Sequence, residues 1–171
     1  IIILIMSKDK LTSIPTEGKK LLESVGPLSI LPQLLASLGA IFAAAGVGDV
    51  IAGMVSNVVP EGNITVAIII YAVAMALFTM IMGNAFAAFS VITIGIGIPF
   101  ILAYGLDPNV VGMIGLTSGY CGTLMTPMAA NFNIVPVAIL EMKDKYGVIK
   151  KQLPIALVML VAQIILMRVM G

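Results

Sequence analysis

Fifteen consecutive residues inside an apolar part of the chain are the ones best suited to hold a polar ligand. Residues 119–133 read GYCGTLMTPMAANFN and contain two glycines, two threonines, a proline, two asparagines and the only cysteine. Glycine and proline interrupt helices, and an interrupted helix leaves backbone N–H and C=O groups free. Because the stretch carries no charge, a ligand there could be held only by these backbone groups and by threonine and asparagine side chains.

A second uncharged interruption lies upstream, where residues 83–87 read GNAFA. Two interruptions predict a shared polar cavity, because paired discontinuous helices are typical of transporter binding sites. Helix N-termini would offer N–H groups to an anion, and helix C-termini would offer carbonyls to a cation. Asn131 and Asn133 cannot share one helical face, which favours real unwinding. The candidate substrate- or ion-binding residues are Gly83, Asn84, Ala85, Gly122, Thr123, Thr126, Pro127, Asn131 and Asn133.

The elements that position these residues must be membrane helices. The chain has 171 residues, 60% hydrophobic and 10% charged, with a mean hydropathy of +1.16. A soluble domain is nearer half apolar and a quarter charged, so lipid is the expected solvent. The net charge of +1 gives no signal for nucleic acid. One cysteine and no histidine exclude an internal disulfide and a cysteine- or histidine-rich metal site.

Charge predicts the orientation in the membrane. Eight of the nine basic residues lie in segments 7–27 and 141–152, whereas the loops near 49–63 and 105–109 carry three acids and no base. The positive-inside rule therefore places the two lysine-rich segments in the cytoplasm, with Arg168 as the one contrary charge. We expect a multi-pass protein of the cell (inner) membrane.

The fold class expected is all-α, a polytopic membrane protein with one helical hairpin and one broken helix. Apolar runs predict helices at about 28–48, 64–82, 88–104, 110–125 with 128–140, and 153–170, within one transmembrane domain over 1–171. Segment 110–140 crosses once, and 31 residues are too many for one straight helix in a core about 30 Å thick. The hairpin of 64–104 either spans fully or re-enters from outside. Pro154 is expected in the first turn of the last helix.

An enzymatic alternative starts from residues 46–49, which read GVGD, a pattern found in intramembrane aspartyl proteases. That chemistry needs a second aspartate within hydrogen-bonding distance. The remaining aspartates, Asp9, Asp107 and Asp144, all lie in predicted loops. We therefore expect no enzyme and interpret Asp49 as an acidic residue at the membrane interface.

The start of the chain is unusual, because six apolar residues from Ile1 are too few to span a membrane and SKDK follows at once. We expect the sequence to be the C-terminal part of a longer protein.

The order of these elements resembles one repeat of the ion transporter superfamily, which includes dicarboxylate/sodium symporters. The hairpin tip of that superfamily carries Ser-Asn-Thr, and the matching positions here are Gly83, Asn84 and Ala85, so only the asparagine is kept. The broken helix of that superfamily has a Pro/Thr-rich unwinding followed by asparagine. Here Thr126 and Pro127 are followed by two asparagines.

More narrowly, MGNAFAAFSVITIGIGIP and GYCGTLMTPMAANFNIVPVAILE resemble a bacterial permease family, one subunit of a two-component 5-oxoproline (pyroglutamate) transporter. The similarity covers nearly all of residues 28–171. It implies secondary active transport of a small organic anion, 5-oxoproline, with a second membrane subunit as partner. It implies no cofactor other than a coupling cation such as sodium or a proton.

Two questions stay open at this point. The alternative function is a non-transporting membrane subunit that assembles or stabilises a partner permease, because one repeat alone cannot form a two-sided cavity. Besides the second subunit and the lipid bilayer, the partner could be another copy of the chain in a homo-oligomer.

Overall fold

The computed structural model describes Pro15, Lys19, Leu34, Ser37, 40–42, 44–56, Val59 and 62–171. Contacts divide the chain into residues 1–35 and 36–171. All of the predicted cytoplasmic segment 7–27 except Pro15 and Lys19, and about half of the predicted helix 28–48, lie outside the described residues.

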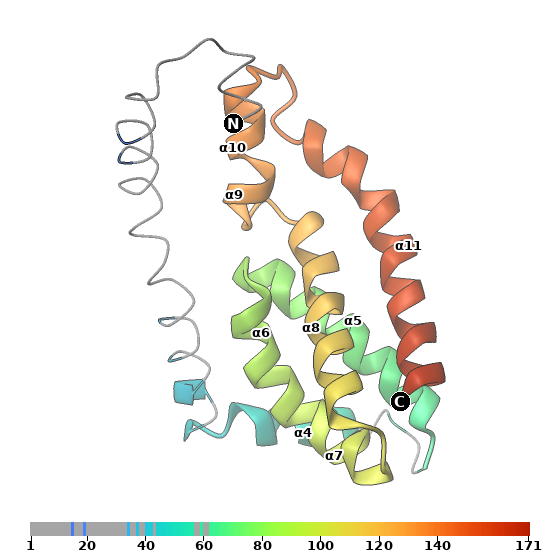
Figure 1. Cartoon of the computed structure of the whole chain (residues 1–171). Coiled ribbons are helices and arrows are strands. Elements are labelled where there is room, and N and C mark those ends of the chain that lie inside the picture. The colour runs from blue at the N-terminus through green and yellow to red at the C-terminus, as the bar shows by residue number, and fades with distance from the viewer. Residues whose placement is uncertain are drawn as a thin grey trace. The chain divides into compact units, whose positions relative to one another are not determined.

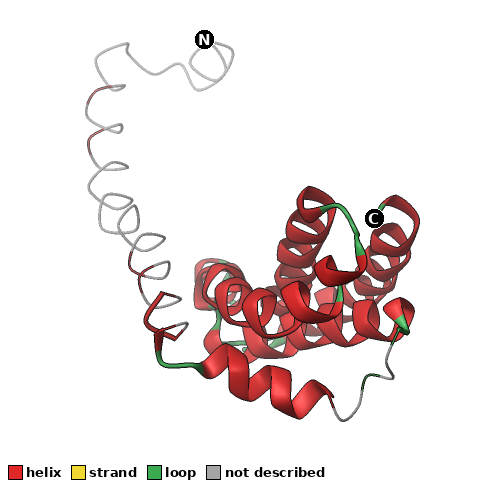
Figure 2. Ribbon diagram, turned by 90° about the horizontal axis from the view of Figure 1, so that it is seen from below, coloured by secondary structure: helices red, strands yellow, loops and turns green. Residues whose placement is uncertain are grey.

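The described part of residues 36–171 is built from helices and their connections, which confirms the all-α prediction (Figures 1 and 2). In chain order these are α4 (Val47–Ser56), α5 (Ile64–Met82), α6 (Ala85–Ile92), the π-helix η1 (Thr93–Gly97), α7 (Ile98–Phe100), the 3₁₀-helix η2 (Leu102–Tyr104), α8 (Pro108–Leu124), α9 (Ala130–Asn133), α10 (Val135–Ile139) and α11 (Gly147–Met170).

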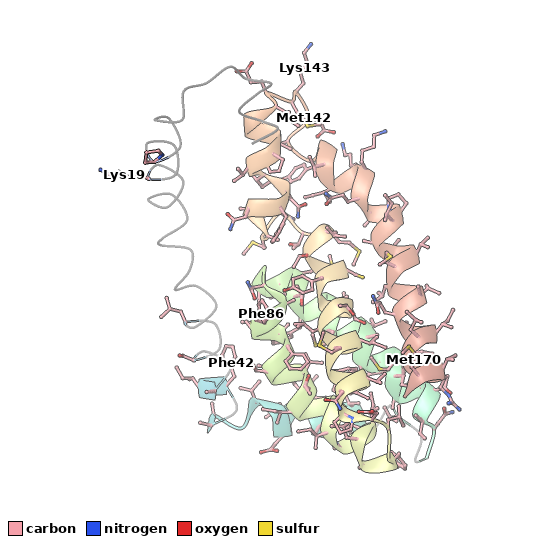
Figure 3. All side chains as sticks on the ribbon, in the orientation of Figure 1. Lys19, Phe42, Phe86, Met142, Lys143 and Met170 are labelled. Carbon is pink, nitrogen blue, oxygen red and sulfur yellow. The ribbon has the colours of Figure 1, made fainter. Side chains whose placement is uncertain are left out.

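Three stretches among the described residues are long and apolar enough to cross a membrane: Ile64–Met82, Ala85–Tyr104 and Gly147–Met170. These three stretches indicate a multi-pass membrane protein. In Figure 3, Met142 and Lys143 lie near the N-terminal end of α11, and Met170 lies at its C-terminal end.

Local sequence explains where the main helices begin and end. Asn63 caps α5 by accepting a hydrogen bond from Val66 N at 3.2 Å, and α5 stops at Gly83, whose φ is 72°. Asp107 caps α8 in the same way, and Pro108 occupies the first helical position, where its missing N–H costs little.

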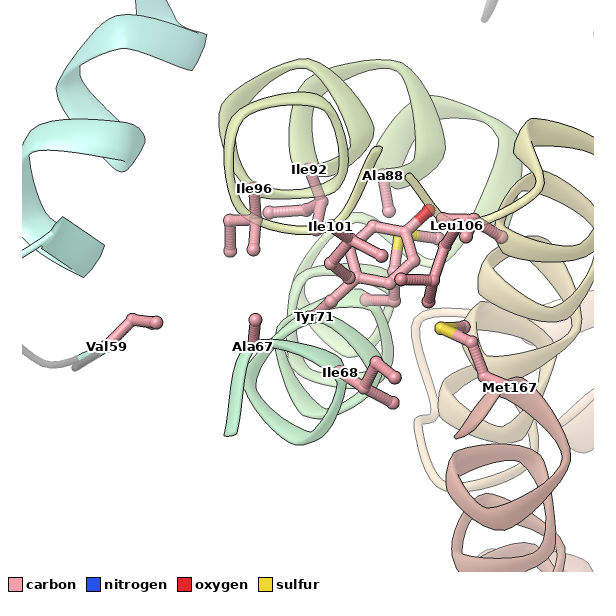
Figure 4. Packing of buried hydrophobic residues seen from close by; sticks show 12 residues of the cluster. Val59, Ala67, Ile68, Tyr71, Ala88, Ile92, Ile96, Ile101, Leu106 and Met167 are labelled. Carbon is pink, nitrogen blue, oxygen red and sulfur yellow. The ribbon is translucent and has the colours of Figure 1, made fainter. Parts of the chain in front are cut away.

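The core lies where α5 packs against α6, η1 and α8. Tyr71 of α5 is fully buried at its centre, surrounded by apolar residues of the neighbouring segments (Figure 4). Close approach of α5 and α8 depends on glycine, since a Cβ at Gly122 would overlap the carbonyl of Ala76. A Cβ at Gly115 would likewise overlap the Tyr71 hydroxyl. This interface holds the two interruptions of the chain side by side.

Helix α4 differs from the loop predicted over 49–63. It places Asp49 in its first turn, where the helix dipole favours an acid, and it packs on η1 through Gly48. A Cβ at Gly48 would lie 2.9 Å from Ile94 Cγ2. At 10 residues the helix is too short to span a membrane. Packing against η1 stabilises α4, and the hydropathy of residues 47–56 does not predict this packing.

The last helix also differs from its prediction, because α11 begins at Gly147 and not near 153. Its first turns carry Lys150 and Lys151 and so extend beyond the apolar run. Pro154 therefore lies in the helix interior and not in the first turn. Similarly, the predicted helix 88–104 begins at Ala85 and contains η1 and η2 within its length.

Candidate functional site

The hairpin turn between α5 and α6 is formed by Gly83 and Asn84. Gly83 adopts the left-handed conformation and donates its N–H to Thr79 O at 2.7 Å. Asn84 caps α6, and its Oδ1 accepts a hydrogen bond from Phe86 N at 2.9 Å. A Cβ on Gly83 would lie 2.7 Å from Met128 O, so the turn also needs glycine because it touches the α8–α9 connection.

The second interruption separates α8, which ends at Leu124, from α9, which begins at Ala130. Thr126 lies in this connection and is buried. Its hydroxyl donates to Met80 O at 2.8 Å and accepts a hydrogen bond from Met128 N at 3.2 Å. Met80 belongs to the last turn of α5, whose carbonyls have no intrahelical partner. Thr126, from the interruption between α8 and α9, thus caps α5, which ends at the interruption at Gly83.

Asn133 caps the C-terminus of α8 from the next segment. Its side chain is fully buried, and Nδ2 donates to Thr123 O at 2.7 Å and to Thr126 O at 2.6 Å. Its Oδ1 is buried without a hydrogen-bond partner, as is the hydroxyl oxygen of Thr79. The unpaired Asn133 Oδ1 and the carbonyls at the C-termini of α5 and α8 make this region electronegative, whereas the Thr79 hydroxyl can donate as well as accept.

The structure brings some predicted residues together and separates others. Gly83, Thr123, Thr126 and Asn133 form one hydrogen-bonded and packed unit with Met80, and we call this unit the junction. Asn84 lies at its edge and is half-buried.

The other predicted residues take no part in these hydrogen bonds. Ala85 and Gly122 pack against neighbouring helices, since a Cβ on Gly119 would lie 3.1 Å from Ala85 Cβ. Pro127 and Asn131 are exposed. Asn131 and Asn133 therefore point to different surroundings, but both lie in the short helix α9, so the backbone is interrupted before them, between Leu124 and Ala130, and not at the asparagines.

No charged side chain occurs in residues 64–106 or 108–140. The 17 residues of α8 extend about 26 Å at 1.5 Å per residue, so the junction lies nearer the end that carries residues 141–146. Figure 1 agrees, since α9 and α10 continue beyond the turn between α5 and α6. Any ligand at the junction would meet backbone dipoles and neutral side chains only.

A groove of about 330 Å³ lies beside the junction, between α8 and α11. Its lining includes Tyr120, Cys121, Thr123, Phe132 and Met159 and is almost entirely apolar. A carboxylate would lose its hydration there without gaining hydrogen bonds. The groove therefore does not suit an organic anion.

Charged residues lie at the ends of the helices. Asp144 accepts hydrogen bonds from Lys150 Nζ at 2.7 Å and Tyr146 N at 2.9 Å, and these bonds lower the pKa of its carboxyl. At the other end of α11, Arg168 Nε donates to Thr65 Oγ1 at 3.2 Å. Asp107 is the N-cap of α8. Among the described residues, no group of three acidic, histidine or cysteine side chains could hold a metal ion.

Two groups at or beside the junction were not predicted. The Met80 carbonyl is a backbone group, and nothing in the local sequence indicates that Thr126 would bind it. The buried hydroxyl of Thr79 was also missed, although its position one turn before Gly83 gave a usable signal. The edge-to-face pair of Phe86 and Tyr120, with ring centroids 6.1 Å apart, joins α6 to α8 nearby.

No curated protein and no solved structure matches the chain significantly. A family model described as a protein of unknown function, DUF979, matches residues 1–171. The chain therefore belongs to the DUF979 family.

Proposed function

We propose that this chain is a membrane permease subunit that moves a small organic anion, with 5-oxoproline as the substrate, by secondary active transport. The observation that carries the proposal is the junction itself. Two uncharged helix interruptions meet there through the Thr126–Met80 hydrogen bond, in a chain whose flanking segments are apolar. Irregular backbone in a membrane persists only where protein or a polar cavity satisfies it.

The anion is proposed to bind at the edge of the junction, at the N-terminus of α6. The first N–H groups of a helix lack intrahelical partners and carry a partial positive charge. Asn84 is half-buried there and uses only its Oδ1 for capping, so its Nδ2 can donate to a carboxylate or to the lactam oxygen of 5-oxoproline. A coupling cation would be drawn to the carbonyl ends of α5 and α8.

The test is uptake of labelled 5-oxoproline by cells that carry the full-length protein and its partner subunit. Asn84→Ser and Asn84→Asp both keep an oxygen that can cap α6, but both remove the Nδ2 donors. The serine hydroxyl can still donate, but its oxygen lies one atom short of the Nδ2 position, and the aspartate carboxylate has no donor. Uptake should be lost in both variants while the protein still reaches the membrane. Asn63→Ser is the matched control, because Asn63 is also a helix N-cap but lies at the start of α5. Normal uptake by Asn84→Ser would refute the site.

The second candidate is a non-transporting membrane subunit that assembles or stabilises a partner permease. The burial of Thr126 and Asn133 in intramolecular hydrogen bonds favours it, because these side chains are already occupied. Uptake by the partner subunit alone, at the rate of the complex, would establish this function and exclude the first.

A further inference from the structure

The second arm of the hairpin is not a uniform helix. After eight residues of α6, the π-helix η1 spans Thr93–Gly97, and the N–H of Ile98 bonds to Thr93 O, five residues earlier. Segments of π-helix within α-helices are uncommon and frequently occur at functional sites. This one lies in the arm that begins with Asn84.

One tyrosine holds η1 to the rest of the hairpin. The Tyr71 hydroxyl of α5 lies 2.8 Å from Thr93 Oγ1, and the tyrosine is fully buried. Its ring contacts Gly97, where an added Cβ would lie 3.2 Å from Cε2, and its hydroxyl faces Gly115 of α8. A single side chain therefore lies between the two arms of the hairpin and α8 (Figure 4).

Helix α4 packs on another side of η1. A Cβ on Gly95 would lie 2.8 Å from Gly48 O and 3.1 Å from Ile51 Cβ. The segment is thus fixed in place by close contacts, and its two glycines remove side-chain bulk where the backbone bends.

The turn-side half of α6 is packed differently from the half next to η1. Near the turn its buried residues are small, namely Ala85, Ala87 and Ala88, and Ala85 faces Gly119. Near η1 they are Val91 and Ile92. A smooth alanine–glycine contact resists sliding less than interlocked branched side chains do, so a tilt of this arm about η1 would move its turn end most and would separate the Phe86–Tyr120 pair.

We infer that η1 is a hinge for α6 and that the Tyr71–Thr93 hydrogen bond is the latch that positions the Asn84 end of the arm. Opening of the latch lets α6 tilt about Thr93–Gly97 and changes the exposure of Asn84 at the junction. In this assignment Tyr71 and Thr93 are positioning residues. The inference deepens the proposed function, because such a tilt would open and close the proposed anion site.

The experiment measures the position of α6 directly in the full-length protein with its partner, in lipid. Spin labels are placed at Phe86→Cys on α6 and Val158→Cys on α11, both exposed, with the native cysteine replaced by Cys121→Ala. Because Phe86→Cys removes the edge-to-face contact with Tyr120, every variant is compared within this one labelled background. We expect Tyr71→Phe, which keeps the ring and removes the hydroxyl, to raise the population of a second inter-label distance about fivefold, as loss of one buried hydrogen bond implies. Thr93→Val should do the same.

Two further variants separate a latch from a general loss of packing. Thr93→Ser keeps a hydroxyl and should restore the wild-type distance distribution. The Tyr71→Phe/Thr93→Val double variant should change it no more than either single variant, because both remove the same bond.

Ser90→Ala is the control, since its hydroxyl bonds only within α6, to Phe86 O. An unchanged distribution in Tyr71→Phe, or an equal change in Ser90→Ala, would overturn the inference. Because the distance is measured without uptake, a failure of transport and a failure of the hinge are distinguishable.

Discussion

Asn133→Ala is the substitution whose effect on stability follows most directly from the junction. The change removes both hydrogen bonds from Nδ2 and leaves the buried carbonyls of Thr123 and Thr126 unpaired. An unpaired buried polar group costs about 1–3 kcal/mol, so the two carbonyls cost about 2–6 kcal/mol. The change also removes the Oδ1 that is unpaired in the native protein, which returns about 1–3 kcal/mol. We expect a net loss of about 2 kcal/mol in the free energy of unfolding.

The matched control is Asn131→Ala, which deletes the same amide two residues away on the same short helix. Its side chain is exposed, so the expected change is within about 0.5 kcal/mol. A second variant, Asn133→Asp, places a carboxylate against two carbonyls and should destabilise the protein more than Asn133→Ala does.

Unfolding by SDS in mixed micelles, followed by circular dichroism, measures all three variants on one scale. We predict that the free energy of unfolding falls least in Asn131→Ala, more in Asn133→Ala and most in Asn133→Asp. If Asn133→Ala were as stable as Asn131→Ala, the Asn133 amide would not be capping α8 and the junction as described would be refuted.

Three other expectations can be checked on the same protein. Gly122→Ala should lower the free energy of unfolding by about 1–3 kcal/mol because its methyl group overlaps a carbonyl of α5, whereas Gly112→Ala, with its nearest contact at 3.9 Å, should not lower it. The Asp144–Lys150 pair, whose carboxyl has a lowered pKa, should protect the start of α11 above the ordinary carboxyl pKa of about 3.9. This protection should disappear as pH falls through the lowered pKa, and amide hydrogen exchange across that range would detect it. Asp49→Asn should leave 5-oxoproline uptake unchanged; lost uptake would contradict the non-enzymatic interpretation.

The interruptions themselves could be predicted because their causes are local. Gly83 ends α5 through its own backbone conformation, and Asn84 caps α6 with its own side chain. The 31 residues between the predicted outer and inner loops exceed one membrane crossing, so a break follows from length, and the glycines, threonines and proline of 119–133 indicate its position. The all-α class follows from composition in the same way.

The pairing of the interruptions could not be predicted, because it depends on contacts between distant segments. Thr126 and Met80 are 46 residues apart, and the acceptor is a backbone carbonyl. Helix α4 differs from the predicted loop, and its contacts with η1 join segments that are distant in the sequence. The π-helix could not be predicted either: the two glycines and three β-branched residues of TIGIG are poor helix formers, but they do not specify which irregular form the backbone takes.

Our proposed site places the transported anion on Asn84, at the edge of the junction. We would test it by equilibrium binding of labelled 5-oxoproline to the purified protein, with and without the proposed partner subunit. Loss of a hydrogen bond to a charged ligand corresponds to at least about a tenfold loss of affinity. We therefore predict saturable binding by the complex, weakened by at least about tenfold in Asn84→Ser and unchanged in Asn63→Ser. Full-affinity binding by the partner alone, or by the Asn84→Ser complex, would contradict the account.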